Sequence, residues 1–240
     1  MNPSDDIQKL LDEERIKFYN YSNFKDVKLV GCGGFGNVYR AVLENNELIV
    51  ALKSFKSNNM TIKEIVNELK LHCKVDIHSN IIRLYGVTKN EDNIILDSMR
   101  YMFVLEYADG GTLRSYFQNH FKRLNWNDKL DFALQISKAV KFLHAENIVH
   151  RDLDDVEQHQ LVLLISDIKN GVREKDIQGT SPAYIKIYKD CWQYDPDLRP
   201  DIQQVVSSLE NIKNPENLEP TIESTDNIPD TFPDGESMQP

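Results

Sequence analysis

The spacing of hydrophobic and polar positions divides this chain of 240 residues into a strand-rich first half and a helical second half. Apolar runs bounded by turn residues predict five strands, at about 25–31, 36–43, 47–54, 81–87 and 101–107. The polar turn at 44–47 makes the second and third of these strands a hairpin. Ahead of them, residues 4–19 predict a polar N-terminal helix.

One helix is predicted among the strands. Ile62, Ile65, Val66 and Leu69 follow the i, i+3, i+4, i+7 spacing of an amphipathic helix over 61–74. Thr61 and Glu64 have the spacing of a capping box at its start. After Gly110-Gly111 the periodicity predicts helices at 112–121, 127–145, 156–170, 183–193 and 201–212. A sheet with one helix, followed by helices, indicates an α+β fold in two parts.

The net charge of −10 comes mainly from the end of the chain. Residues 214–240 hold seven of the 38 acidic residues, five of the nine prolines and no Lys or Arg, which predicts a disordered tail. The first 213 residues therefore carry 31 acidic and 28 basic side chains. This near balance leaves no basic stripe for a nucleic-acid partner.

The cysteines and the apolar runs indicate the cellular compartment in which the protein is expected. Cys32, Cys73 and Cys191 lie far apart without a C-x-x-C pair, which argues against a zinc site and a disulfide framework. The first residues, M-N-P-S-D-D, are unlike a signal peptide. Apolar runs such as 161–165 are too short to cross a bilayer. We therefore expect a reduced, soluble, cytoplasmic protein with no membrane partner.

The first candidate for chemistry is the glycine-rich stretch at 31–38, G-C-G-G-F-G-N-V. A G-x-G-x-x-G pattern also occurs in dinucleotide-binding folds, where a helix follows the glycines directly. Here 38–42 is rich in strand-forming residues and a second strand ends at Lys53, which favours a hairpin that covers phosphates. A plain glycine-rich turn is the alternative.

Two further motifs and a block near the C-terminus narrow the interpretation of this hairpin. Residues 50–53 read V-A-L-K and residues 150–153 read H-R-D-L. With the glycine-rich stretch, they resemble the phosphate loop, nucleotide-binding strand and catalytic loop of protein kinases. Residues 191–200, C-W-Q-Y-D-P-D-L-R-P, resemble a block of tyrosine kinases and tyrosine-kinase-like kinases.

The resemblance spans about residues 22–212 and implies the bilobal kinase fold. It implies a β-rich N-lobe with its hinge at 22–108 and a shortened helical C-lobe at 109–213. The N-terminal helical segment, 1–21, would precede these lobes, and the acidic tail, 214–240, would follow them.

The resemblance also implies an ATP site. Its residues would be Gly31, Gly33, Gly36, Val38, Ala51, Lys53, Glu106 and Ala108. Lys53 would contact the α- and β-phosphates and pair with Glu68, and backbone groups of Glu106 and Ala108 would bond adenine. Asp152 would accept or steer the proton of the substrate hydroxyl. Outside this family, Lys53 and Glu68 would be read as a surface lysine and a solvated helical glutamate.

The chain departs from the family after its catalytic loop, because neither D-F-G nor A-P-E occurs. Glu157 stands where an Asn should hold magnesium, and Asp167 is the best substitute for the metal-binding Asp. Ile168-Lys169 follows Asp167, however, and the surrounding segment resembles a late kinase helix more than a metal loop. These residues are therefore weak metal candidates.

The interval between the catalytic loop and the C-terminal block is also short. Only 46 residues separate Asp152 from Arg199, too few for a metal loop, activation segment, A-P-E and core helix. Arg199 pairs with the glutamate of A-P-E in the family, so we expect it to be an unpaired buried charge, at a cost of about 3–5 kcal/mol. An inactive family member, a spliced form and a gene-prediction error each explain the gap.

Two functions follow as hypotheses. The first is an ATP- and Mg²⁺-dependent protein kinase acting on Ser/Thr or Tyr of protein substrates, with Asp167 in the metal site. The second is a catalytically inactive, kinase-like scaffold that binds a nucleotide or a signalling partner. The genomic sequence between the codons for Leu153 and Asp154 would show whether a D-F-G segment has been lost from the chain.

Overall fold

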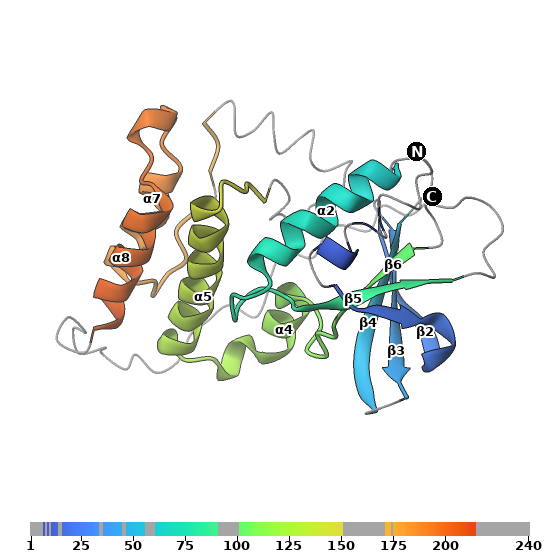
Figure 1. Cartoon of the computed structure of the whole chain (residues 1–240). Coiled ribbons are helices and arrows are strands. Elements are labelled where there is room, and N and C mark those ends of the chain that lie inside the picture. Colours follow the sequence, from blue (N-terminus) through green and yellow to red (C-terminus); the bar gives the residue numbers. More distant parts are fainter. Residues whose placement is uncertain are drawn as a thin grey trace, which may run out of the picture.

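A computed structural model describes most of the chain as a sheet-based half followed by a helical half (Figure 1). The described residues are 7, 9, 11–13, 16–33, 36–44, 47–55, 61–90, 101–150, 171–173 and 175–214. The predicted helix at 156–170, and all but the first residue of the predicted tail, lie outside them. The α+β fold with two parts is confirmed.

The first half is built on a six-stranded sheet with the order β1-β5-β6-β4-β3-β2. Its strands are β1 (Phe18–Asn20), β2 (Phe24–Cys32), β3 (Gly36–Leu43), β4 (Leu48–Phe55), β5 (Leu84–Lys89) and β6 (Tyr101–Glu106). β2, β3 and β4 form consecutive antiparallel pairs, and β6 joins β4 to β5. β1 pairs with β5 in the parallel direction. The five predicted strands therefore correspond to β2 to β6.

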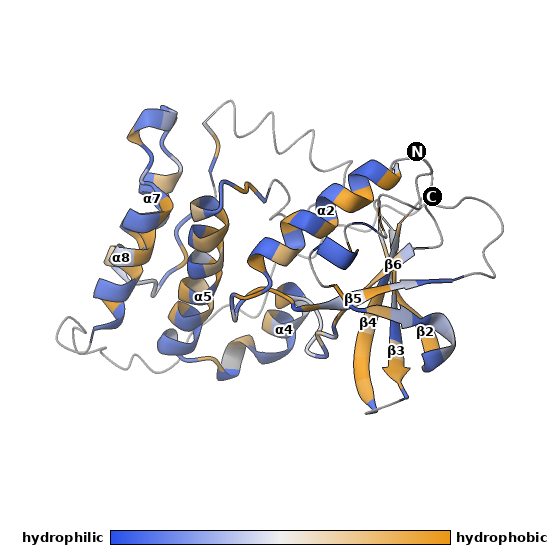
Figure 2. Ribbon diagram, viewed as in Figure 1, coloured by the Kyte–Doolittle hydropathy of each residue, from blue (hydrophilic) through white to orange (hydrophobic). Residues whose placement is uncertain are grey.

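Helix α2 (Ile62–Val75) covers one face of this sheet. The predicted capping box is present: the Thr61 hydroxyl accepts from the Glu64 amide, and the Glu64 carboxylate accepts from the Thr61 amide. The hydrophobic stripe of α2 turns towards the sheet (Figure 2). Ile65 and Leu69, each 1% exposed, pack in one cluster with Phe103 of β6.

The second half is helical and has a small core. Its helices are α4 (Leu113–His120), α5 (Trp126–Ala145), α7 (Pro182–Cys191) and α8 (Ile202–Lys213). Leu130 and Leu134 of α5 pack against Val206 and Leu209 of α8. Short 3₁₀ turns lie at Tyr21–Asn23 (η1), Phe121–Arg123 (η2) and Pro196–Leu198 (η3).

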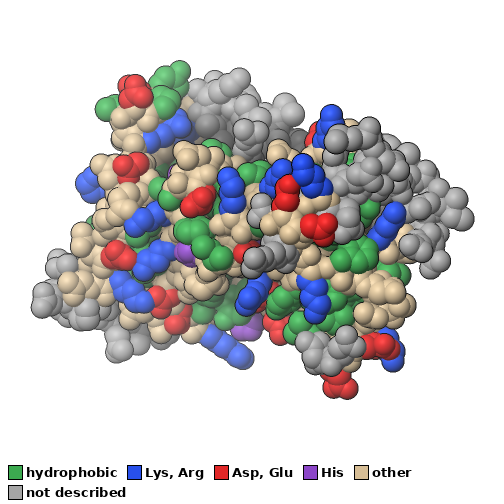
Figure 3. All heavy atoms as spheres, in the orientation of Figure 1, with side chains coloured by type: hydrophobic (Ala, Val, Ile, Leu, Met, Phe, Trp, Pro, Cys, Tyr) green, Lys and Arg blue, Asp and Glu red, His purple; other side chains and the backbone are tan. Residues whose placement is uncertain are grey.

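Charged side chains of both signs are interspersed over the face shown in Figure 3. Ion pairs join helices of the second half: Lys138 lies 2.9 Å from Glu210, and Lys213 pairs with Asp131. Among the described helices, none combines the length and hydrophobicity needed to cross a membrane.

The expected polar helix over 4–19 is wrong at its C-terminal end and in its polarity. Residues 7, 9 and 11–13 are helical, but 18–20 form β1. Ile7 and Leu11 are 1% and 4% exposed, because they pack into the core between α2 and the sheet. The backbone edge of β5 offers hydrogen bonds that a local pattern does not reveal.

The expectation of a buried, unpaired Arg199 is also wrong. Arg199 is exposed, and its Nε donates to the carbonyl of Gln193 at 2.8 Å. Its Nη2 donates to the carbonyl of Tyr194 at 3.4 Å. The η3 turn brings the side chain back over the preceding residues at the surface, so the expected desolvation penalty does not arise.

Candidate functional site

The glycine-rich stretch forms the turn between β2 and β3. Gly31 lies opposite Val38 in the β2–β3 register, and the Gly33 amide donates to the Gly36 carbonyl at 2.9 Å. A Cβ on Gly36 would lie 1.8 Å from the carbonyl oxygen of Ser54, so the approach of β4 requires glycine there. The hairpin expected from the sequence is therefore present.

Gly31 and Gly33, unlike Gly36, have room for a side chain among the described residues. A Cβ would meet nothing closer than 3.7 Å at Gly31 and 3.9 Å at Gly33, among the described residues. Neither residue has the positive φ that favours glycine. Packing and backbone conformation therefore do not require glycine at these two positions.

Lys53 is held beside this hairpin by β4. It lies opposite Val38 of β3 and Phe103 of β6. Its Nζ donates to Oε1 of Glu68 on α2 at 2.6 Å. The two side chains are 30% and 33% exposed, so solvent and ligands can reach the pair. The Lys53 Nζ also lies 5.5 Å from the ring centroid of Phe55.

The contact between Lys53 and Glu68 that the resemblance implies is thus present. A partly exposed ion pair of this kind contributes only about 0.2–1 kcal/mol to stability. Its consequence is geometric: it fixes the ammonium group near the glycine turn, provided that α2 stays against the sheet.

The hinge residues lie at the end of β6. Leu105 is buried with Ala51, its partner across the β4–β6 pair, in the cluster beneath α2. The Glu106 amide donates to the carbonyl of Arg83 at 2.9 Å, and Glu106 Oε2 accepts from the Arg83 amide at 3.2 Å. The Glu106 amide is therefore already bonded within the protein.

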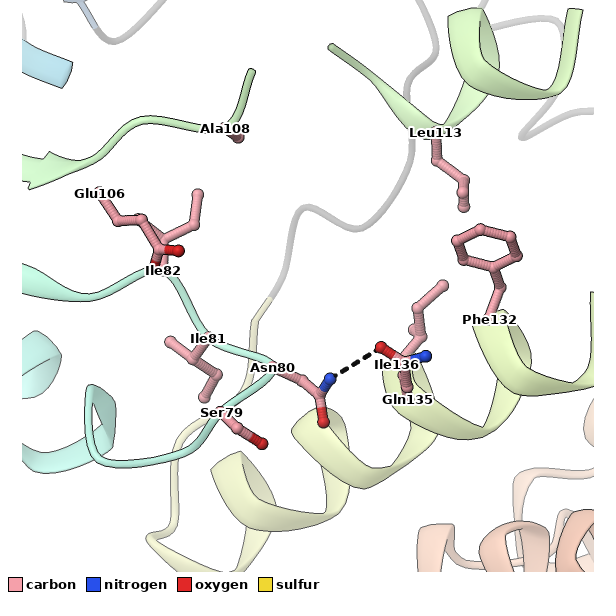
Figure 4. Close-up of a pocket in the computed structure, with 10 residues that line it drawn as sticks. All are labelled: Ser79, Asn80, Ile81, Ile82, Glu106, Ala108, Leu113, Phe132, Gln135 and Ile136. Atoms are coloured by element: carbon pink, nitrogen blue, oxygen red, sulfur yellow. Dashed lines mark hydrogen bonds between the residues drawn. The ribbon is translucent and has the colours of Figure 1, made fainter. Parts of the chain in front are cut away.

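A cavity of about 410 Å³ lies beside the hinge, between the two halves (Figure 4). It is lined by Ser79, Asn80, Ile81, Ile82, Glu106, Ala108, Leu113, Phe132, Gln135 and Ile136. Glu106 and Ala108 line it, but Lys53 and the three glycines do not. This cavity therefore does not include the expected phosphate-side residues, although β4, which carries Lys53, pairs directly with β6, which ends at Glu106.

Sequence reasoning missed the contacts that join the two halves near this cavity. Asn80 Nδ2 donates to Gln135 Oε1 of α5 at 3.0 Å. The His78 ring lies 5.1 Å from the Phe142 ring. These pairs are more than 50 residues apart in the chain, and nothing in a single sequence pairs them.

The H-R-D-L motif begins five residues after the end of α5. The Ile148 amide donates to the Leu143 carbonyl at 2.8 Å, and Asn147 takes a φ of 58° where the chain leaves the helix. Residues 151–170 are not among the described residues, so the structure does not place Asp152, Glu157 or Asp167. In the part that is described, no group of three or more His, Cys, Asp or Glu residues is arranged to hold a metal.

The sequence matches a known protein family over its first part. The family described as "Protein tyrosine and serine/threonine kinase" matches residues 24–157, more than half of the chain. A probable serine/threonine-protein kinase of Dictyostelium discoideum is 29% identical over 143 residues, 58% of this chain and 15% of the relative. Cysteine-rich receptor-like protein kinase 6 of Oryza sativa subsp. japonica is 33% identical over 159 residues, 62% and 22% of the two chains.

Aurora kinase C of Mus musculus is 30% identical over 140 residues, 57% of this chain and 48% of the relative. The chain thus spans less than half the length of each of these three relatives. The family match begins at β2 and ends at residue 157, just beyond the H-R-D-L motif.

Proposed function

The chain belongs to the family of protein tyrosine and serine/threonine kinases, and from this premise we propose that it binds ATP but transfers phosphate poorly or not at all. The observation that carries the binding part is the contact of 2.6 Å between Lys53 and Glu68 beside the glycine turn. An ammonium group held there, on a side chain that is 30% exposed, can meet the phosphates of a nucleotide.

The glycines support the same proposal. Because neither φ nor packing against the described residues requires glycine at Gly31 and Gly33, approach of a ligand is a physical reason for the missing side chains. Backbone amides without a neighbouring Cβ can come close to phosphate oxygens. Val38, Ala51 and the backbone of Ala108 would border the base and sugar of ATP.

The impaired transfer is argued from the catalytic sequence. Mg²⁺, when bound, would neutralise charge on the β- and γ-phosphates. The chain has no D-F-G and has Glu157 in place of the expected Asn. Each lost group of this electrostatic kind commonly lowers the rate by about 10²–10³. Asp152 does not compensate, because it would act on the substrate hydroxyl and not on the phosphate charge.

The protein would then act as a nucleotide-binding scaffold for a signalling partner in the cytoplasm. If transfer does occur, protein Ser/Thr or Tyr side chains would be its substrates, and Asp167 would be the candidate metal ligand.

Nucleotide binding is tested by titrating the protein with a fluorescent ATP analogue. Lys53→Met should weaken binding about 10- to 100-fold, as expected for loss of a hydrogen bond between charged groups. Lys28→Met, which removes an exposed lysine from β2, should leave the affinity unchanged. No binding by the parent protein, or equal binding by Lys53→Met, would refute the proposed site.

Transfer is tested with radiolabelled ATP, Mg²⁺ or Mn²⁺ and a generic protein substrate. The parent protein should incorporate no more label than Asp152→Asn. Robust turnover that requires Asp152 would show an active kinase, and its loss in Asp167→Asn would identify Asp167 as the metal ligand.

A further inference from the structure

The segment before β2 contacts the helix that carries Glu68. Ile7 and Leu11 are 1% and 4% exposed, and they share one core cluster with Ile65 and Leu69 of α2. The short helical piece of this segment lies against α2 in Figure 1, drawn in dark blue. Residues before the first strand of the family match therefore form part of the packing that holds α2.

The same segment is tied to the edge of the sheet. The Ile16 amide donates to the Leu11 carbonyl, and the Val87 amide of β5 donates to the Lys17 carbonyl, both at 2.9 Å. A Cβ on Gly86 would lie 2.1 Å from the Lys17 carbonyl oxygen and 2.8 Å from the ring of Tyr19. The absence of a side chain at Gly86 is thus what lets the segment pass over β5.

Beyond β5 the segment reaches the opposite face of the sheet. Tyr19 and Phe24, 9% and 7% exposed, pack there with Val104 and Met102. Their ring centroids lie 6.0 Å apart. We call the described residues 7–20 the strap, since they contact α2 on one face of the sheet, pair with β5 through β1 and end on the other face.

We propose that the strap positions the nucleotide site, with Ile7 and Leu11 as positioning residues that keep Glu68 in contact with Lys53. Ile65 and Leu69 lie three residues before and one residue after Glu68 on α2. Removing their partners in the strap lets α2 move from the sheet, which lengthens the 2.6 Å contact. The strap itself has no part in the phosphate cradle, so its effect on binding passes through α2.

This inference rests on the proposed nucleotide binding and adds a control point to it. A partner that draws the strap away from β5 and α2 would weaken binding from outside the site. The Lys53–Glu68 pair is sensitive to such a change because a 2.6 Å contact between charges depends on the position of the whole helix.

A double-mutant cycle on the full chain separates positioning from general stability. Leu11→Ala should weaken binding of a fluorescent ATP analogue at least about fivefold, the lower end of ordinary coupling between sites. In a Glu68→Gln background, Leu11→Ala should have little further effect, because the contact it protects is already lost. Leu11→Met, which keeps the volume of the side chain, should bind the analogue with the affinity of the parent.

Leu209→Ala is the matched control, because Leu209 is 3% exposed in α8, in the other core. It should lower the melting temperature but leave the affinity for the analogue unchanged. Additive effects of Leu11→Ala and Glu68→Gln, or parent-like affinity of Leu11→Ala, would overturn the proposal. Leu11→Val, a smaller truncation, replaces Leu11→Ala in the cycle if the alanine variant does not fold.

Hydrogen exchange without nucleotide gives an independent readout. Leu11→Ala should speed exchange of the amides in α2 (62–75), whereas Leu209→Ala should not. Unchanged exchange in α2 would overturn the strap proposal even if nucleotide binding holds. Faster exchange in a protein that binds no nucleotide would overturn the proposed function and leave the strap holding α2.

Discussion

The two halves of the described chain rest on cores of very different size. Twenty of the 25 buried hydrophobic side chains lie at or before Leu105, and five lie after it. The described residues are divided almost evenly between the halves. The sheet has an apolar cluster on each face, whereas the described part of the second half has one cluster, between α5 and α8.

This difference bears on function as well as on stability. Burial of apolar surface contributes about 25 cal/mol per Å², so the first half gains far more from its core than the second half does. Lys53, which is proposed to contact the ATP phosphates, and its partner Glu68 belong to the well-packed half. The H-R-D-L motif, which includes Asp152, follows α5 along the chain. Nucleotide binding should therefore be more robust than catalysis.

The largest predicted effect is a difference in the loss of unfolding free energy when one buried leucine in each half is truncated. Leu69 in α2 and Leu130 in α5 are both helical and both 1% exposed. Truncation of a buried leucine to alanine costs about 2–5 kcal/mol, and the cost falls where the surroundings can collapse. Leu69→Ala should lie near the upper end of this range and Leu130→Ala near the lower end.

Urea unfolding followed by tryptophan fluorescence and circular dichroism measures both costs. Trp126 and Trp192 lie in the second half, so fluorescence reports that half and circular dichroism reports the whole chain. An equal or larger cost for Leu130→Ala would show that the second half is as firmly packed as the first.

Local signals explain which features were predictable. The capping box of Thr61 and Glu64, and the stripe that places Leu69 inward, depend on residues a few positions apart, and both are present. β1 depends on pairing Phe18 with Val87, and the position of Arg199 depends on a turn that folds it back to Gln193. Neither of these was recognised from the sequence.

The same distinction holds for the candidate site. The sequence identified the glycine turn, and the family resemblance identified the pairing of Lys53 with Glu68. The helix position that makes this pairing possible depends on Ile7 and Leu11, which the local pattern placed in a polar helix. The cavity at the hinge depends on loops and helices from both halves, so no single motif indicates it.

A second prediction compares two glycines of the same turn. Gly36→Ala would place a Cβ 1.8 Å from the Ser54 carbonyl oxygen, so β3 and β4 must separate. Overpacking of this kind costs about 1–3 kcal/mol of unfolding free energy. Among the described residues, a Cβ at Gly33 meets nothing closer than 3.9 Å, so Gly33→Ala should change stability by no more than about 0.5 kcal/mol.

Thermal and urea unfolding of both variants provide the measurement, with ATP-analogue binding as the second readout. Gly33→Ala should weaken binding while it leaves stability intact, since the added methyl group would fill space that we propose a ligand needs and that no described side chain occupies. If Gly33→Ala binds as tightly as the parent, the ligand explanation for this glycine is wrong. Equal stability of the two variants would contradict the packing argument for Gly36.

The smallest predicted effect concerns a polar contact that helps to hold the second half together. Asp176 Oδ2 accepts from Lys189 Nζ at 2.6 Å, and Asp176 Oδ1 accepts from the Tyr188 hydroxyl at 2.7 Å. The hydrogen bond from Lys189, followed by that from Tyr188, lowers the pKa of Asp176 below its ordinary value of 3.8. The hydrogen bond to Asp176 raises the pKa of Tyr188 to about 12.

These directions set the pH window in which the contact stabilises the protein. The lowered pKa of Asp176 gives a contribution that is complete above 3.8 and is lost as the pH falls through the folded-state value. The raised pKa of Tyr188 gives a contribution that is complete below 10.0 and is lost as the pH rises towards about 12.

Asp176→Asn should therefore lower the melting temperature slightly between about pH 5 and 9, and the difference in melting temperature from the parent should disappear at lower and at higher pH. Asp109→Asn, which removes an exposed carboxylate from the hinge, should show no such window. A difference between Asp176→Asn and the parent that stays constant into acid would mean that the charge of the Asp176 carboxylate does not contribute to the stability of the protein.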